Sequence, residues 1–268
     1  MPPFFTKSTP RLFAHRGASG EAPENTLFAF RRAVTLGIEY IELDVHVSRD
    51  GHVVVIHDVS VERTTNGAGT VQEQTLAQLQ EWDAGYHFSP DSGETFPFRA
   101  TGVTIPTLAE VFQHCPGVKF TVEIKPQEPA IEAEVIAVVR ACGREADVIL
   151  ASEHDAVLQR VRNLAPDFVT SFAYGEVFDF IQRVTTGALA DYLPPGQAIQ
   201  IPPAFQGVPL VTKQTLSMAR EFGCEMHVWT INDADEMLRL LELGVDGVMS
   251  DFPGVLLEVA RRRGKSNS

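Results

Sequence analysis

The sequence contains few of the residues that build cross-linked, nucleic-acid-binding or membrane-spanning proteins. It has only three cysteines, Cys115, Cys142 and Cys224, whose spacing fits neither a disulfide framework nor a zinc site. Lys and Arg total 22 against 35 Asp and Glu, and the net charge of -13 disfavours binding to nucleic acids or anionic membranes. No apolar run approaches the roughly 18 residues of a membrane span, and residues 1–10 show no signal segment. These absences predict a cytoplasmic protein without stable membrane insertion.

An alternation of short apolar segments with longer amphipathic ones is present instead. The short segments are typical of buried parallel strands and lie at 11–15, 40–46, 119–125, 148–152, 168–172, 198–201, 225–230 and 247–250. Helical patterns between them lie at 26–36, 131–141, 155–164, 213–222 and 233–243. About eight strand–helix units close a (β/α)8 TIM-type barrel of roughly 250 residues. We therefore expect an α/β fold with one catalytic barrel domain over 1–268.

One interval is too long for an ordinary connection between two barrel strands. About seventy residues separate position 47 from position 118, well beyond the usual length of a crossover. The interval begins with a hairpin-like pattern, in which the turn Asp50-Gly51 precedes the apolar residues 53–56. The turn Asn66-Gly67, a short helical pattern at 76–82 and a loop rich in Gly, Ser and Pro follow. We expect a small insertion over about 59–104, after the second strand and on the face where barrel active sites lie.

Acidic side chains alternate with apolar ones in two of the predicted strands. Neighbouring side chains of a strand point to opposite faces, so Glu42 and Asp44 share one face, and Glu123 and Lys125 share one face of the next barrel strand. The apolar faces should meet the helices, which leaves the carboxylates in the barrel mouth. There they are either solvated or salt-bridged, or a bound cation or one shared proton offsets their repulsion. Oxygen ligands suit one divalent cation, Mg²⁺ or Ca²⁺, better than zinc.

Histidine and basic residues stand where catalysis in a barrel takes place. His15 and Arg16 end the first predicted strand, and His57 ends the apolar run after it. Two histidines can take a proton from a nucleophile and give one to a leaving oxygen near neutral pH. The planar guanidinium of Arg16 matches two phosphate oxygens. Lys125 either binds phosphate as a point charge or only forms an ion pair with a neighbouring carboxylate.

In their order and spacing, these motifs resemble the glycerophosphodiester phosphodiesterases. The resemblance covers 13–253 and rests on His15-Arg16-Gly17, Pro23-Glu24-Asn25-Thr26, Glu42-Leu43-Asp44-Val45, His57-Asp58, Arg63-Thr64-Thr65-Asn66-Gly67, Ile105-Pro106-Thr107-Leu108, Glu123-Ile124-Lys125 and Val228-Trp229-Thr230-Ile231-Asn232. It implies a distorted barrel, a catalytic pair, three substrate-binding residues and three metal ligands. The catalytic pair is His15 and His57, the substrate-binding residues are Arg16, Lys125 and Trp229, and the metal ligands are Glu42, Asp44 and Glu123.

Some conspicuous residues have a structural interpretation. Asp251, ahead of Phe252-Pro253, has the pattern of a helix N-cap with proline in the first turn. Glu24 and Asn25 lie at the start of the first predicted helix, where capping explains them. Trp229 is either a substrate contact or a plain core tryptophan. The remaining histidines are expected to be structural, and Ala151-Ser152 replaces the Ser-Phe of many family members, which puts the leaving-group preference in doubt.

Three function classes follow from these residues. The leading one is hydrolysis of glycerophosphodiesters to glycerol 3-phosphate and an alcohol, and a lysophospholipase D with a longer-chain substrate is closely related to it. A barrel lyase with a Schiff base on Lys125 is disfavoured, because carboxylates nearby hold that amine charged. A non-catalytic phosphate-binding protein is disfavoured too, because binding alone does not require two histidines. In each case the expected partner is a small molecule.

Overall fold

Eight parallel strands form the wall of a nearly closed barrel in this computed structural model, which describes residues 2–7 and 9–266. Their order around the barrel is β6-β5-β4-β2-β1-β11-β10-β7, and a bridge between Ser171 and Ala198 brings the two edges together. The strands are β1 (Arg11–His15), β2 (Tyr40–Val47), β4 (Lys119–Ile124), β5 (Val148–Ala151), β6 (Val169–Thr170), β7 (Ala198–Ile201), β10 (Glu225–Val228) and β11 (Gly247–Ser250). The predicted (β/α)8 TIM-type barrel is thereby confirmed, with every expected strand in place.

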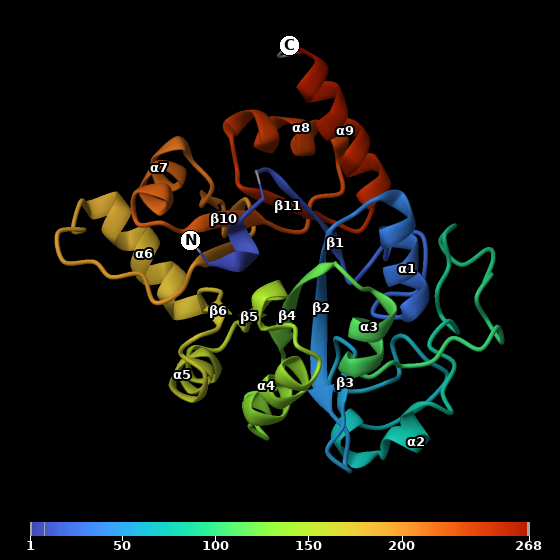
Figure 1. The fold of residues 1–268 in the computed structure, drawn as a ribbon. Helices are drawn as coiled ribbons and strands as arrows, with labels where there is room; N and C mark the ends of the chain where they lie inside the picture. The colour runs from blue at the N-terminus through green and yellow to red at the C-terminus, as the bar shows by residue number, and fades with distance from the viewer. Residues whose placement is uncertain (1, 8, 267–268) are drawn as a thin grey trace.

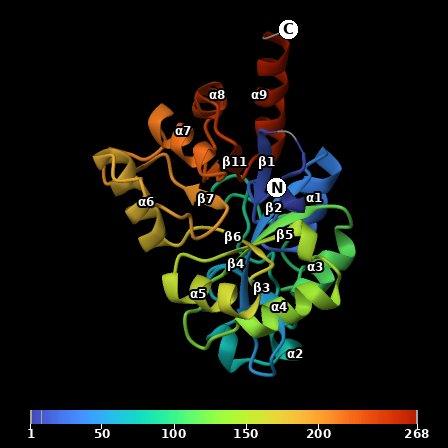
Figure 2. The same ribbon diagram turned by 60° about the vertical axis from the view of Figure 1, so that its left-hand side comes forward.

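Helices surround the barrel on its outside (Figures 1 and 2). They are α1 (Leu27–Leu36), α3 (Leu108–His114), α4 (Glu132–Ala141), α5 (Asp155–Leu164), α6 (Tyr174–Thr186), α7 (Lys213–Glu221), α8 (Ala234–Leu243) and α9 (Pro253–Ser266). Of the short 3-10 turns, η1 (Pro3–Phe5) packs into the end of the barrel, η2 (Val71–Glu73) belongs to the segment 59–104, and η3 (Glu145–Asp147) precedes β5. Sequence patterning did not predict α3 or α6. The capping box of Thr107 and Glu110 marks the start of α3 and could have revealed it. No helix within the described residues combines the length and apolarity needed to cross a bilayer.

The barrel has two kinds of core because its strands alternate inward and outward side chains. Outward-facing Leu43 and Val122 pack with the helices in a large apolar cluster. Inside the barrel, Phe13 and Tyr40 pack with Phe4 and other apolar residues in a separate cluster. Farther along β1 and β2, the residues that share the inner face with these aromatics are polar. The closed end of the barrel is therefore filled with aromatic rings, and polar side chains are left for the open mouth.

In the chain, the segment 59–104 connects β3 to α3. In space it lies beside α1 and near the C-terminal end of β2, which the arrowhead marks in Figure 1. β3 (Val53–Val55) pairs antiparallel with β2, as the Asp50-Gly51 pattern predicts. The segment contains α2 (Leu76–Leu79) and packs its own small core, which includes Val61 and Leu79, against Val54. A second hairpin, which was not predicted, joins β8 (Ala204–Phe205) to β9 (Val208–Pro209).

Candidate active site

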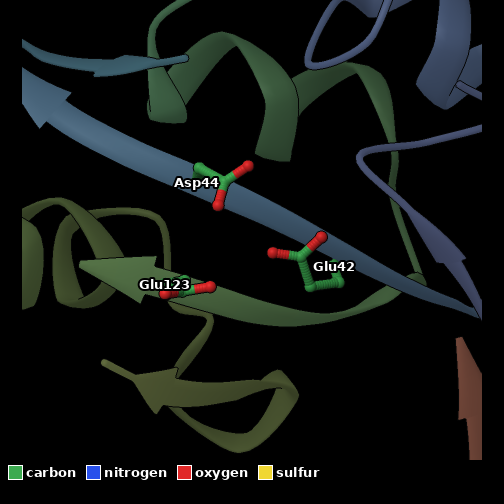
Figure 3. A group of neighbouring side chains, drawn as sticks. All are labelled: Glu42, Asp44 and Glu123. Atoms are coloured by element: carbon green, nitrogen blue, oxygen red, sulfur yellow. The ribbon is translucent and has the colours of Figure 1, made fainter. Parts of the chain in front are cut away.

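Three carboxylates meet at the mouth of the barrel, as expected from strand alternation. Glu42 and Asp44 come from β2, and Glu123 comes from β4, where it is level with Asp44 in the strand register (Figure 3). One oxygen from each side chain lies within 4.8 Å of the others. Glu42 and Asp44 are buried, and 25% of the Glu123 side chain is exposed. This arrangement leaves the cluster open to solvent through Glu123.

The electrostatics of the cluster favour a cation. Burial and the charge of Asp44 raise the pKa of Glu42 to about 8. Burial also raises the pKa of Glu123, although Lys125 opposes this shift. The pKa of Asp44 is lowered despite its burial, because Lys125 and Arg16 stabilise its charge. Three carboxylates crowded at a partly open mouth are a donor set that fits a hard divalent cation.

Lys125 lies between two of these carboxylates. Its Nζ is 2.9 Å from Oε1 of Glu123 and 3.1 Å from Oδ1 of Asp44. Burial disfavours the charged amine, but Asp44 and Glu123 outweigh it and raise the pKa of Lys125. A charged amine cannot attack a carbonyl carbon, so this environment argues against a Schiff base on Lys125.

His15 ends β1 and contacts both the cluster and a carboxylate outside it. Its Nε2 lies 3.7 Å from Oε2 of Glu42, and its Nδ1 lies 2.7 Å from Oδ1 of Asp251. Asp251 also accepts hydrogen bonds from Ser19 and Asn232. The interpretation of Asp251 as a helix N-cap is therefore wrong, because its two oxygens serve these side chains rather than backbone amides of α9. The signal was its place directly after β11, at the catalytic end of a barrel strand.

Arg16 follows His15 in a left-handed conformation, with φ of 54°. Gly17 continues the turn with φ of 82°, and a Cβ there would approach Ala29 to 2.7 Å, so the tight turn excludes larger residues. The turn directs the guanidinium into the site, with Nε 3.1 Å from Oδ2 of Asp44 and Nη1 3.0 Å from Oε1 of Glu24.

Glu24 and Asn25 belong to the site and not to the helix cap. The side chain that caps α1 is Thr26, whose hydroxyl accepts from the amide of Ala29. Glu24 instead bonds to Arg16. Asn25, with φ of 57°, donates from Nδ2 to Oδ2 of Asp44 at 2.9 Å. The capping interpretation is therefore wrong for both residues, because each side chain turns away from α1 toward the barrel mouth.

His57 lies just beyond the end of β3. Its charge is close enough to Asp44 to contribute to the lowering of the pKa of that carboxyl. Its Nδ1 lies 2.6 Å from Oδ1 of Asp58. The buried ring of His46 donates from Nε2 to the carbonyl of His57 at 3.0 Å, which gives His46 the structural role expected of it. Both candidate catalytic histidines thus have Nδ1 occupied by a carboxylate.

Trp229 follows β10, and 40% of its surface is exposed. This exposure excludes the interpretation as a plain core tryptophan. Its amide donates to the carbonyl of Ile201 at the end of β7, which places the residue at the same end of the barrel as the carboxylates.

Comparison with known proteins agrees with this geometry. Residues 15–255 match the model of the Glycerophosphoryl diester phosphodiesterase family. A glycerophosphodiester phosphodiesterase of Caldanaerobacter subterraneus is 35% identical over 94% of this chain and 98% of its own, and one of Bacillus subtilis is 30% identical over 92% and 85%. The solved structure of an Oleispira antarctica phosphodiesterase in complex with the product sn-glycerol-3-phosphate has a TM-score of 0.74 and 28% identity, and covers 94% of this chain and 97% of its own.

Proposed function

This chain belongs to the glycerophosphoryl diester phosphodiesterase family and is a phosphoric diester hydrolase, and from that premise we propose a division of labour within its site. One divalent cation, Mg²⁺ or Ca²⁺, supports hydrolysis of a glycerophosphodiester to glycerol 3-phosphate and an alcohol. His15 and His57 are the catalytic acid and base, and Arg16 and Lys125 hold the phosphate. The observation that carries the proposal is the meeting of three carboxylates at the barrel mouth, with His15 beside Glu42 and His57 close enough to influence the pKa of Asp44.

Glu42, Asp44 and Glu123 are the proposed metal ligands. Their oxygens lie close enough together to share one ion, and the raised pKa of Glu42 reflects its burial and its repulsion by Asp44, both of which a cation would offset. When bound, the ion supplies a Lewis acid for a phosphate oxygen and compensates negative charge in the transition state.

Arg16 and Lys125 are the proposed phosphate ligands. They approach Asp44 from two directions, and both remain charged in this environment. A phosphodiester placed over the carboxylates would meet two cations, of which Arg16 offers a planar fork and Lys125 a point charge. These cations also orient the phosphate so that its ester oxygens point toward the histidines.

Each histidine presents Nε2 as its reactive atom in this proposal. Because a carboxylate accepts from Nδ1 of His15 and another from Nδ1 of His57, the neutral ring carries its proton on Nδ1 and leaves Nε2 free to accept one. One Nε2 removes the proton of the attacking hydroxyl, and the other, when protonated, gives its proton to the leaving alkoxide. Such proton transfers contribute about 10²- to 10⁴-fold each.

Trp229 is the proposed contact for the glycerol or the leaving group. Its partly exposed ring stands at the catalytic end of the barrel, where an apolar face can cover the carbon atoms of the substrate.

The proposal is tested by an assay for released glycerol 3-phosphate. Glycerophosphocholine, glycerophosphoethanolamine and a lysophosphatidylcholine are each supplied with a chelator, and then with excess Mg²⁺ or Ca²⁺. We expect both glycerophosphodiesters to be hydrolysed only when metal is present. Exclusive release of choline from the lysophospholipid would favour the lysophospholipase D alternative, and full activity in chelator would refute the metal. A borohydride-trapped adduct at Lys125 would revive the lyase hypothesis.

A substrate with a p-nitrophenolate leaving group separates the roles of the histidines. This group needs no proton to leave, so replacing the acid with alanine should cripple hydrolysis of glycerophosphocholine and spare the activated diester. Replacing the base should cripple both reactions. Equal proportional losses in the His15→Ala and His57→Ala variants would contradict a division into acid and base.

A further inference from the structure

We infer that Arg63 is a positioning residue that holds His57 and Arg16 in a fixed relation through Asp58 and Glu24. This inference rests on the proposed roles of His57 and Arg16. It assigns a function in the reaction to a residue of the segment 59–104 that reaches the substrate only through other side chains.

The guanidinium of Arg63 binds two carboxylates at once. Nε and Nη2 donate to the two oxygens of Asp58 at 2.5 and 3.2 Å. Nη1 and Nη2 donate to the two oxygens of Glu24, each at 2.8 Å. Two-point contacts of this kind fix the orientation of both partners as well as their distance, because the guanidinium is planar and rigid.

Each of the two carboxylates also holds a proposed functional residue. Asp58 accepts from Nδ1 of His57 at 2.6 Å, and Glu24 accepts from Nη1 of Arg16 at 3.0 Å. The bonds form one chain, which runs from His57 through Asp58, Arg63 and Glu24 to Arg16. His57 lies beyond β3 and Arg16 beyond β1, two strands that both pair with β2, and the chain of bonds adds a direct side-chain link between the two residues. Arg63 therefore joins the proton-transfer group to the phosphate-binding group.

The charges along the chain match this arrangement. Glu24 and Asp58 have pKa values below their usual ranges despite burial, because Arg63 and their second partners stabilise the carboxylates. Without Arg63 the two anions would lose their common cation. Glu24 would then no longer be held in place and could shift together with Arg16. The Asp58 carboxylate would be free to rotate away from the His57 ring.

Arg63 is also suited to this role by its place in the chain. It lies in the first residues of the segment 59–104, and its side chain is about half exposed, so it is not a core residue of the barrel. The ion pairs of a half-exposed arginine contribute little to folding stability. Its geometric effect on the site is expected to exceed its effect on folding, since a displacement of about 1 Å can cost 10²-fold in rate.

The two arms of the chain predict different kinetic effects. Asp58→Asn weakens the hold on His57 and should mainly lower kcat for glycerophosphocholine. Glu24→Gln weakens the hold on Arg16 and should mainly raise KM. Arg63→Lys keeps the charge and loses the fork, so it should do both, with a loss in kcat/KM of about 10- to 100-fold, the range typical of residues that orient functional groups. Combining Arg63→Ala with Asp58→Asn should lower kcat by less than the product of the two single effects.

Arg239→Lys is the matched control. Arg239 makes a two-point contact with Glu236 on α8 at 2.6 and 2.7 Å and is similarly exposed, but it lies outside the site. Thermal unfolding of all variants reports any structural loss. Arg63 variants with kcat and KM within twofold of wild type would overturn the inference, as would a kcat loss that is fully additive with Asp58→Asn. Loss of activity matched by a fall in Tm, with no split between kcat and KM in the two arms, would reduce Arg63 to a structural anchor.

His57→Ala and Arg16→Ala in the same assay separate this inference from the proposed function. If both are inactive while the Arg63 variants are normal, the proposed function stands and the positioning role fails. If both retain wild-type kinetics, the proposed roles of His57 and Arg16 fail, and the positioning role fails with them. Should Arg63→Ala not fold, Arg63→Lys and the Asp58 and Glu24 variants still decide the question.

Discussion

Asp251 lies 236 positions after His15, and its Oδ1 is 2.7 Å from Nδ1 of that histidine. The pKa of Asp251 is about 2, because His15, Asn232 and Ser19 outweigh its burial, so it remains a carboxylate acceptor under assay conditions. This pair orients the ring of His15, whose Nε2 faces Glu42. Each end of the chain therefore contributes one half of the proposed catalytic pair of His15 and its carboxylate.

Asp251→Asn should lower kcat by about 10- to 100-fold, the usual effect of removing a carboxylate that orients a histidine. The amide keeps the size of the side chain but loses its charge, and with a single acceptor oxygen it cannot accept from both Nδ1 of His15 and Nδ2 of Asn232. Steady-state kinetics with glycerophosphocholine measure the loss, and circular dichroism checks the fold. Asn232→Asp provides a comparison on the other oxygen. Wild-type kcat in Asp251→Asn would show that His15 needs no carboxylate partner.

Glu123→Gln should weaken binding of Mg²⁺ or Ca²⁺ by more than about 100-fold, beyond the effect of removing an outer-shell group, and leave the fold near wild type. The substitution removes charge and keeps shape. Isothermal titration calorimetry on the chelator-treated protein gives the affinity. Glu153→Gln is the control, since Glu153 is close enough to influence the pKa of Glu123 but lies outside the cluster. Unchanged affinity in Glu123→Gln would place the ion elsewhere.

Arg16→Lys should lower kcat/KM by about 10- to 100-fold, because lysine keeps the charge but cannot contact two oxygens in one plane. The same exchange at Arg32, which pairs with Glu21 on the surface, should have no kinetic effect. The measurement is kcat/KM of the two variants and the wild type on one substrate. Equal activity of Arg16→Lys and wild type would assign Arg16 a structural role.

Replacing 86–98 with a short linker should change leaving-group selectivity more than stability. We propose that the barrel folds as one domain and that the segment 59–104 shapes the substrate rather than supporting it. Phe98 packs edge-on against Phe28 of α1, with ring centroids 5.8 Å apart, so some stability is lost. We expect Tm to fall by less than about 5 °C, while the ratio of kcat/KM for choline and ethanolamine diesters shifts. A collapse of folding with an unchanged ratio would refute this role.

Glu225→Gln should destabilise the closed end of the barrel at neutral pH and not at low pH. Glu225 binds the fully buried Arg11 through both oxygens, at 2.6 and 2.7 Å. Its pKa is lowered despite burial, because His227 and Arg11 stabilise the charge. Since the folded pKa lies below the unfolded value, this stabilisation is present above about pH 4.3 and is lost as pH falls through the folded pKa.

Urea unfolding of Glu225→Gln and wild type measures this difference. At pH 7 the variant should be less stable by about 3 kcal/mol, the usual cost of leaving a buried charge without its partner. The difference should shrink as the pH falls below 4. A difference that does not depend on pH would mean that the charge of Glu225 is not what stabilises Arg11.

Local sequence was sufficient for the strands and for the carboxylate cluster. The period-two alternation in 40–46 and 119–125 determines which side chains face the barrel axis, and this holds wherever the strands lie in the sheet. Glu42, Asp44 and Glu123 could therefore be placed together before their neighbours were known. The strands β1, β7 and β11 have the bounds that their apolar segments predict.

Local sequence failed where one residue had two possible partners. Asp251, Glu24 and Asn25 each stand next to a helix start, and a side chain in that position often caps the helix. The helix α6 begins at Tyr174 after Ala173. Alanine has no side-chain oxygen, so the N-cap position did not indicate the start of this helix.

The sequence by itself determined the barrel, the inward face of each strand and the cluster of three carboxylates at its mouth. The tertiary structure alone decided which side chains touch there. Asp251 reaches His15 because closure of the sheet sets β11 beside β1, and Arg63 reaches Glu24 because the segment after β3 folds back toward the turn that follows β1. Both contacts join residues that are distant in the chain, so they depend on the tertiary fold, and no local sequence pattern predicts them.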